Sequence, residues 1–105
     1  MPSQNSVLYI NVKEIVYFKS DGRYTNIHLI DGTVLTSTES LKNCMKIIGP
    51  PAFIRIHKSF IINLLHVKRY ARGRDSYVKM ENDIRIDVGN MYKDELAEIV
   101  SFFLK

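Results

Sequence analysis

Two Asp-Gly pairs, at residues 21–22 and 31–32, constrain the fold of this 105-residue chain more than any other feature. Glycine accepts the positive φ angle that tight hairpin turns require, so Asp-Gly between strand-like segments is a strong hairpin signal. Such segments stand before, between and after the two pairs, as "IVYFKS", "RYTNIHLI" and "TVLTS". The sequence therefore predicts an antiparallel meander over residues 15–37. Residues 7–12 ("VLYINV") predict a further strand ahead of it.

The hydrophobic period changes to that of a helix in two places. Within residues 38–48, apolar side chains recur at helical spacing from Leu41 to Ile48, and Gly49-Pro50-Pro51 forbids continuation. Residues 90–104 show the same spacing, with acidic side chains in the first turns where they suit the helix dipole. We therefore expect one short internal helix and one C-terminal helix.

The middle of the chain returns to strand-like alternation. Residues 53–57 predict a strand with Ile54 and Ile56 facing the core and Arg55 and His57 facing out. The next stretch, "SFIINLLHV", is too apolar for a solvent loop and short for a helix, which leaves its structure open. Residues 67–71, 76–80 and 84–88 predict two more hairpins. The expected fold class is mostly β, an antiparallel arrangement with two helices.

Length and composition restrict the class of protein. A chain of 105 residues fits a single domain with its own core. The single Cys44 cannot form an internal disulfide, and we expect it to be a small buried hydrophobe. With no signal-like N-terminus and no apolar run near 18 residues, we expect a cytoplasmic protein without a membrane segment.

Motifs for catalysis or metal binding are missing from the sequence. There is no HExxH, P-loop, GxGxxG or GxSxG pattern, and none of the three histidines pairs with Cys44 at metal-ligand spacing. We therefore expect no enzymatic activity, no catalytic residues, no metal site and no cofactor.

Positive charge is concentrated in one third of the chain. Residues 53–85 carry eight Lys/Arg against three acidic residues, whereas the remainder is close to neutral. A cluster of this kind suggests a polyanionic partner, although solvated basic faces are common.

The order of these features resembles one known family. "DGRYTNIHLIDG" and "FIRIHKSFIIN" stand before and after the short helix, and "IRIDVGNMYKDEL" follows. Over Val7 to Val100 the chain is similar to the LytTR family, the DNA-binding effector domains of bacterial response regulators in two-component systems. The resemblance implies an elongated, mostly antiparallel β domain with a core at residues 7–100. It also implies sequence-specific binding of double-stranded DNA through loops and strand ends in successive major grooves.

The resemblance also implies which segments contact DNA, namely residues 20–25, the His57-Lys58-Ser59 corner and the residues just before the last helix. Lys58, Ser59 and Lys93 suit phosphates, whereas Arg23 and Asn90 have the donors to read base edges. Tyr24 and Thr25 are candidates for contact with sugars, phosphates or a thymine methyl group. His57 is equally well explained as a structural residue that orders the corner. Asn63 is expected to stabilise a turn through side-chain hydrogen bonds to the backbone rather than to contact DNA.

Two features stand apart from that pattern. The densest basic run, Arg69 to Arg74, lies outside the family's main contact segments, so we rank it second. Many family members also carry a basic pair where this chain has Gly89-Asn90-Met91, which implies weaker binding at that point.

The resemblance further implies partners. Family sites are commonly direct repeats, so a homodimer on DNA is expected, with the dimer contacts made mainly by a receiver domain that is absent here. The chain is then the C-terminal effector part of a larger response regulator, or else a stand-alone member. The alternative readings are a β-rich protein-interaction or ligand-binding module with an incidental basic patch, and an RNA-binding domain.

Overall fold

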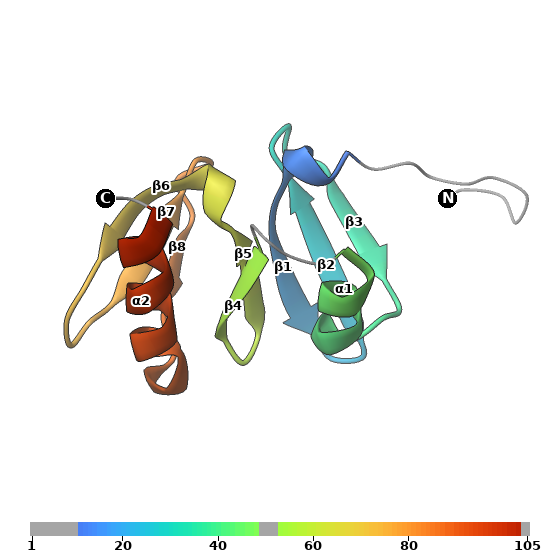
Figure 1. Cartoon of the computed structure of the whole chain (residues 1–105). Coiled ribbons are helices and arrows are strands. Elements are labelled where there is room, and N and C mark those ends of the chain that lie inside the picture. Colours follow the sequence, from blue (N-terminus) through green and yellow to red (C-terminus); the bar gives the residue numbers. More distant parts are fainter. Residues whose placement is uncertain (1–10, 49–52, 104–105) are drawn as a thin grey trace, which may run out of the picture.

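A computed structural model describes residues 11–48 and 53–103. Three strands and a helix come first, followed by a hairpin, a second group of three strands and the last helix (Figure 1). The strands are β1 (Ile15–Asp21), β2 (Tyr24–Leu29), β3 (Val34–Ser37), β4 (Phe53–His57), β5 (Phe60–Asn63), β6 (Val67–Ala71), β7 (Tyr77–Met80) and β8 (Arg85–Asp87). The helices are α1 (Leu41–Ile48) and α2 (Lys93–Phe103), with the 3-10 turns η1 (Val12–Glu14), η2 (Leu64–His66) and η3 (Asn90–Tyr92).

The predicted meander is confirmed and forms part of a five-stranded antiparallel sheet with the order β3-β2-β1-β5-β4. Gly22 and Gly32 take positive φ angles of 62° and 92°, as the two Asp-Gly turns require. The expected strand at 7–12 is wrong at its end, because Val12 begins η1 instead. The side chain of Asn11 caps this turn by accepting a hydrogen bond from the Lys13 amide at 3.0 Å. Residues 7–10 lie outside the described part of the chain.

The stretch left open by the sequence divides into β5 and η2. Asn63 marks the division and is fully buried. Its Oδ1 accepts from the Leu65 amide at 3.0 Å, and its Nδ2 donates to the Ile15 carbonyl at 2.8 Å. This side chain therefore holds the turn that leads out of β5 and ties it to the start of β1. The expectation that Asn63 serves the fold is confirmed.

The two later hairpins are also confirmed and make a separate antiparallel sheet with the order β6-β7-β8. Asp83 takes a positive φ of 66° in the second of these turns.

Both helices are shorter than expected at their N-termini. The α1 helix begins at Leu41 after Ser40, whose hydroxyl accepts from the Asn43 amide at 3.2 Å. The α2 helix begins at Lys93 because residues 90–92 form η3.

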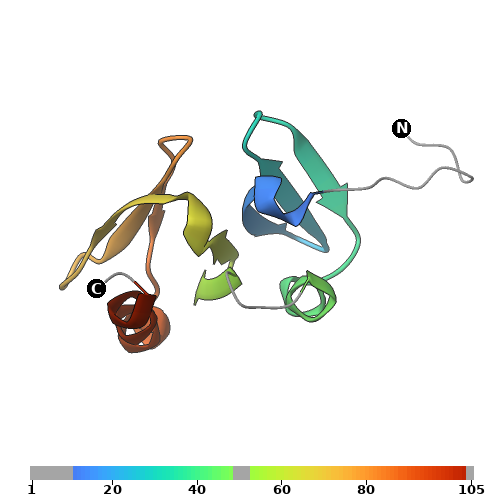
Figure 2. The same ribbon diagram turned by 45° about the horizontal axis from the view of Figure 1, so that its top comes forward.

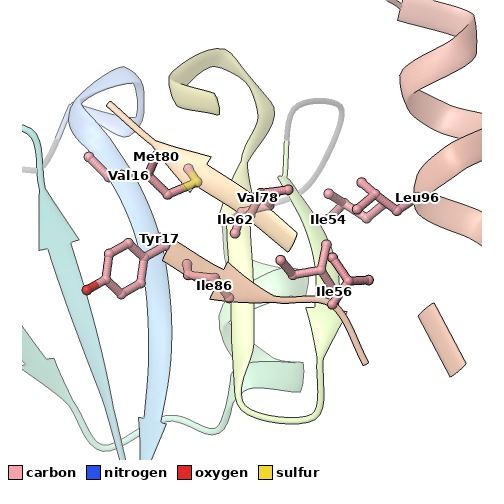
Figure 3. Packing of buried hydrophobic residues seen from close by; sticks show 10 residues of the cluster. Val16, Tyr17, Ile54, Ile56, Ile62, Val78, Met80, Ile86 and Leu96 are labelled. Atoms are coloured by element: carbon pink, nitrogen blue, oxygen red, sulfur yellow. The ribbon is translucent and has the colours of Figure 1, made fainter. Parts of the chain in front are cut away.

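Hydrophobic side chains form two clusters. One packs α1 on the five-stranded sheet through Ile15, Phe18, Ile27, Leu41, Cys44, Phe53 and Ile61. The other joins the two sheets and α2 through Val16, Tyr17, Ile54, Ile56, Ile62, Val78, Met80, Ile86, Val88 and Leu96 (Figure 3). Each fully buried aliphatic side chain contributes about 1.5–3 kcal/mol. The shared cluster therefore fixes the small sheet and α2 relative to the large sheet.

Cys44 lies inside the first cluster and is only 5% exposed, as expected for a small hydrophobe. Burial raises the pKa of its thiol. The molecule is elongated, with extents of 47 × 24 × 22 Å. Neither helix of the described residues is long and apolar enough to cross a membrane.

Candidate nucleic-acid interface

The three segments singled out from the sequence meet along one long edge of the molecule. The Ser20 amide at the end of β1 donates to the Ser59 carbonyl in the β4–β5 turn at 2.9 Å. On the other side of that turn, the Gly89 amide donates to the Ile56 carbonyl at 2.8 Å. The turns after β1 and β4 and the start of α2 lie along the lower side of the molecule in Figure 1. We call this the loop edge. It comprises residues 19–25, 57–59, 72–75 and 89–95.

The β4–β5 turn is held from inside by Arg55 and His57. The guanidinium of Arg55 donates to the carbonyls of His57, at 3.3 Å, and of Lys58. The Ser59 amide donates to His57 Nδ1 at 3.0 Å. Since Nδ1 accepts, the ring proton of the neutral imidazole lies on Nε2. His57 therefore orders the corner, in agreement with its interpretation as a structural residue. The Lys58 side chain is exposed and does not hold the turn.

The β1–β2 turn presents Arg23 and Tyr24 at its tip. Arg23 is exposed and the Tyr24 side chain is 50% exposed. Thr25 is different and corrects the prediction, because it is only 1% exposed and its hydroxyl donates to the Glu39 carbonyl at 2.7 Å. Alternation could have shown this, since Thr25 is in phase with the buried Ile27 on the same strand face. Thr25 therefore positions the turn and has no free group for a ligand.

The segment before α2 is pressed against the His57 corner. A Cβ added to Gly89 would lie 3.1 Å from Cδ2 of Tyr92 and 3.7 Å from Cα of His57, so only glycine fits without a shift. Asn90 is exposed, and Met91 is 91% exposed. Gly89 thus brings these two side chains next to the β4–β5 turn.

Lys93 joins the loop edge to the basic run that the sequence ranked second. Its Nζ donates to the Arg74 carbonyl in the β6–β7 turn at 2.6 Å. Arg72 and Arg74 are exposed in that turn. Sequence reasoning missed this proximity, because a contact between the first residue of α2 and a turn 19 residues earlier leaves no periodic signal. The signal that could have pointed to this segment was the high density of basic residues from Arg69 to Arg74.

Lys19 is a further cation that the sequence did not single out. It is exposed on β1, paired with Phe60, and its Nζ lies 5.9 Å from the centroid of the Phe60 ring. The same ring packs edge-on against His57, with the centroids 5.6 Å apart. Lys19 therefore stands beside the β4–β5 turn.

The loop edge carries more positive than negative charge. Its cations are Lys19, Arg23, Lys58, Arg72, Arg74 and Lys93. Its acidic residues are Asp21, Asp75, Asp94 and Glu95. Such a mixed edge attracts a polyanion but lacks the dense charge of a strongly binding surface.

His28 lies away from the loop edge, and its ring stacks on Tyr17 with the centroids 4.2 Å apart. Burial lowers the pKa of His28, and the charge of Lys19 lowers it further. The ring is therefore neutral and serves the packing of the large sheet.

Comparison with solved structures supports the fold. A LytTr DNA-binding domain from Bacillus cereus superposes with a TM-score of 0.81, covering 94% of this chain and 92% of that one, at 20% sequence identity. The two chains therefore share the arrangement of two antiparallel sheets.

Curated relatives match at the level of sequence. The sensory transduction protein LytT of Bacillus subtilis is 25% identical over 97 residues, which is 90% of this chain and 40% of LytT. The CO-responsive transcriptional regulator RcoM of Rhodospirillum rubrum is 28% identical over 68 residues, 65% of this chain and 28% of RcoM. The chain spans less than half of the length of either relative. The family model described as the LytTr DNA-binding domain matches residues 5–101. The chain belongs to the LytTR family of DNA-binding domains.

Proposed function

We propose that this domain binds double-stranded DNA in a sequence-dependent way through the loop edge and thereby directs a transcription regulator to its sites. One observation carries the proposal. Backbone hydrogen bonds from Ser20 to Ser59 and from Gly89 to Ile56 hold turns from separate elements in one row. The cations of these turns therefore face a ligand together, already arranged for an extended polyanion.

The dimensions favour contact with successive major grooves. Neighbouring major grooves on one face of DNA lie about 34 Å apart. The long axis of 47 Å exceeds this distance, whereas the short axes of 24 and 22 Å do not reach it. Tight turns also enter a groove about 12 Å wide without requiring a recognition helix. Turns near the two ends of the loop edge are therefore suited to two adjacent grooves.

The exposed and half-buried side chains of the loop edge divide into two roles. Lys58 and Lys93 neutralise phosphates, and the Ser59 hydroxyl adds a donor to the same backbone. Lys93 uses one donor on the Arg74 carbonyl and keeps the rest of its ammonium group for DNA. Arg23 and Asn90 read base edges, where one bidentate contact discriminates between bases by about 1–3 kcal/mol. Tyr24 packs on sugars, and His57 offers its Nε2 proton to a phosphate.

The arrangement of sites follows from the family. We propose that two copies bind direct repeats and that this chain acts as the DNA-reading part of a longer regulator with a receiver domain. The names of the relatives, a sensory transduction protein and a CO-responsive transcriptional regulator, fit a domain that is coupled to a sensor. Linked copies raise affinity without new contacts, so the isolated domain is expected to bind weakly.

RNA binding has less support than DNA binding. Reading RNA on a sheet requires aromatic side chains exposed on its face. Tyr17 is 5% and Phe18 1% exposed, because both pack in the core. Tyr24 is exposed, but it stands at a turn.

The test is a titration with duplex DNA from upstream of the gene for this chain, at two salt concentrations. We expect affinity to fall steeply with salt and the upstream sequence to bind more tightly than a scrambled one. Absence of salt-dependent binding to any duplex, even by a tethered dimer, would refute the proposal. A protein-interaction module would give that result.

Lys58→Ala provides the residue-level test, with Lys13→Ala as its control. Both lysines are exposed, but Lys13 lies in η1, at the other end of β1 from the loop edge (Figure 1). We expect Lys58→Ala to weaken binding and leave the melting temperature unchanged, and Lys13→Ala to leave both unchanged. Equal loss of binding in the two variants would show that only total charge matters.

A further inference from the structure

The small sheet carries a second row of positive charge on the face that points away from the core. Arg69, Lys79 and Arg85 are direct partners across β6, β7 and β8. Their neighbours along the strands, Val78 and Ile86, are buried in the cluster between the sheets. Alternation therefore puts the three cations on the outer face (Figure 2 shows this sheet from a second direction).

Ion pairs of the fold involve Arg85 at one end of this row and Lys68 next to its other end. Nε of Arg85 is 3.2 Å from the Asp87 carboxylate, and its guanidinium lies over the Tyr77 ring at 4.0 Å. Lys68 pairs with Asp83 at 2.8 Å. Within residues 11–48 and 53–103, Arg69 and Lys79 have no ion pair, although the charge of Lys79 adds to that of Lys68 in lowering the pKa of Asp83.

Like charges directly opposite one another destabilise a sheet. The arrangement is therefore a cost to the fold, and internal pairing does not explain it. The surface is also hollowed here, in an open depression lined by Lys68, Arg69 and Lys79. A concave row of cations that the fold neutralises only in part, with Arg69 and Arg85 exposed and Lys79 half-buried, is suited to an anionic ligand that extends along it.

The spacing fits a nucleic-acid backbone. Neighbouring strands lie about 4.8 Å apart, so three paired residues span about 10 Å. One DNA strand rises about 3.4 Å per phosphate along the helix axis and also winds around it, so a row of this length meets about two phosphates.

The row begins on β6, the strand that leads into the loop edge. Arg72 and Arg74 in the β6–β7 turn connect β6 to Lys93, whose Nζ contacts the Arg74 carbonyl at 2.6 Å. The β6–β7 turn thus carries cations between α2 and the strand on which the row begins.

We propose that this outer face binds the phosphate backbone of duplex DNA that flanks the sequence read by the loop edge. The inference rests on the proposed function and adds a second contact on one side of the site only. The alternative occupant, an acidic protein surface, gives a different outcome in the test below.

The test compares duplexes of two lengths that carry a site selected by the protein from random DNA. The short duplex has about 15 base pairs, the length that 47 Å covers at about 3.4 Å per base pair. The long duplexes extend it by about 15 base pairs on one side or the other. We expect wild-type protein to bind one long duplex more tightly than the short one and with a steeper salt dependence.

The variant is Arg69→Gln with Lys79→Gln. We expect it to abolish the gain from the long duplex, lower the salt slope there by about 1.8 for two lost phosphate contacts, and leave binding to the short duplex unchanged. Removing opposed like charges should not lower the melting temperature. If it does, Lys79→Gln alone is used. The control, Lys13→Gln with Lys42→Gln, removes two exposed cations from the other half of the chain and should retain the gain.

Two results would overturn the inference. Equal loss on both lengths would show that the row gives only general attraction. No change on either would leave the face free for an acidic protein. In both cases, binding of the short duplex by the wild-type protein would still support DNA binding through the loop edge. The proposal for the outer face can therefore fail while the proposed function stands.

Discussion

Asn63 stabilises the fold through two hydrogen bonds of its buried side chain. It is 0% exposed and satisfies both the Ile15 carbonyl and the Leu65 amide. Asn63→Ala leaves the buried Ile15 carbonyl and the partly buried Leu65 amide without partners, which should lower the free energy of unfolding by about 2–4 kcal/mol. For a domain of this size the melting temperature should then fall by about 10 °C or more. Thermal unfolding followed by circular dichroism measures the change.

Asn90 gives the matched comparison, since it is an exposed asparagine at the loop edge. Asn90→Ala should leave the melting temperature within about 4 °C of wild type, because surface substitutions usually change stability by less than about 0.5 kcal/mol. It should reduce discrimination between bases at one position of the site. If Asn63→Ala proved as stable as Asn90→Ala, the role assigned to Asn63 in the fold would be wrong.

Met91 is the position where one substitution should strengthen binding. It is 91% exposed, next to Asn90 on the loop edge, and carries no charge. Met91→Arg places a cation there, which should tighten DNA binding and increase the salt slope by about 0.9 if it meets one phosphate. Fluorescence anisotropy at several salt concentrations provides both quantities. Met91→Gln adds polarity without charge, and an equal gain from that variant would contradict the electrostatic explanation.

At the scale of elements, the sequence predicted those turns and strands whose position depends on the residues within them. Asp21-Gly22 and Asp31-Gly32 place their turns because few other residues accept the required φ. The stretch at residues 59–67 could not be assigned, since a short apolar run fits a buried strand or a helix. The Lys93–Arg74 contact was inaccessible for another reason, as it depends on how α2 packs on the small sheet. The sequence therefore predicted the segments of the candidate site. It missed the contact between Lys93 and Arg74, which depends on tertiary packing.

His66 links three elements and should make their association depend on pH. Its Nδ1 lies 2.9 Å from the Glu81 carboxylate, and its Nε2 contacts the Lys13 carbonyl. Both partners are acceptors, so the protonated ring satisfies both. Burial lowers the pKa of His66, but the hydrogen bonds to Lys13 and Glu81 outweigh it and raise that pKa above its ordinary value.

A raised pKa in the folded state fixes the sign of the effect. The stabilisation is complete below the unfolded pKa of about 6.5 and is lost as pH rises through the higher folded pKa. The difference in unfolding free energy between wild type and His66→Gln should therefore be larger at about pH 5.5 than at about pH 8.5. We expect less than about 1 kcal/mol for this partly exposed pair. Urea unfolding measures it, and a difference that grows with pH would contradict the assignment.

At the scale of the whole molecule, rigidity determines how the domain can meet DNA. The cluster from Val16 to Leu96 joins both sheets and α2, so the turns of the loop edge cannot move apart independently. A domain that contacts two major grooves must therefore find them at one fixed separation, about 34 Å along the axis and in the same rotational phase.

Insertions at the centre of a selected site test this constraint on a single domain. Five added base pairs turn the second groove to the opposite face and should abolish specific binding. Ten restore the phase but move the groove about 34 Å further, so a molecule 47 Å long can no longer reach both contacts. Both insertions should therefore reduce affinity to that of scrambled DNA in a gel-shift titration. If the ten-base-pair insertion retained specific binding, the two halves of the site would have to be read by separate copies of the domain.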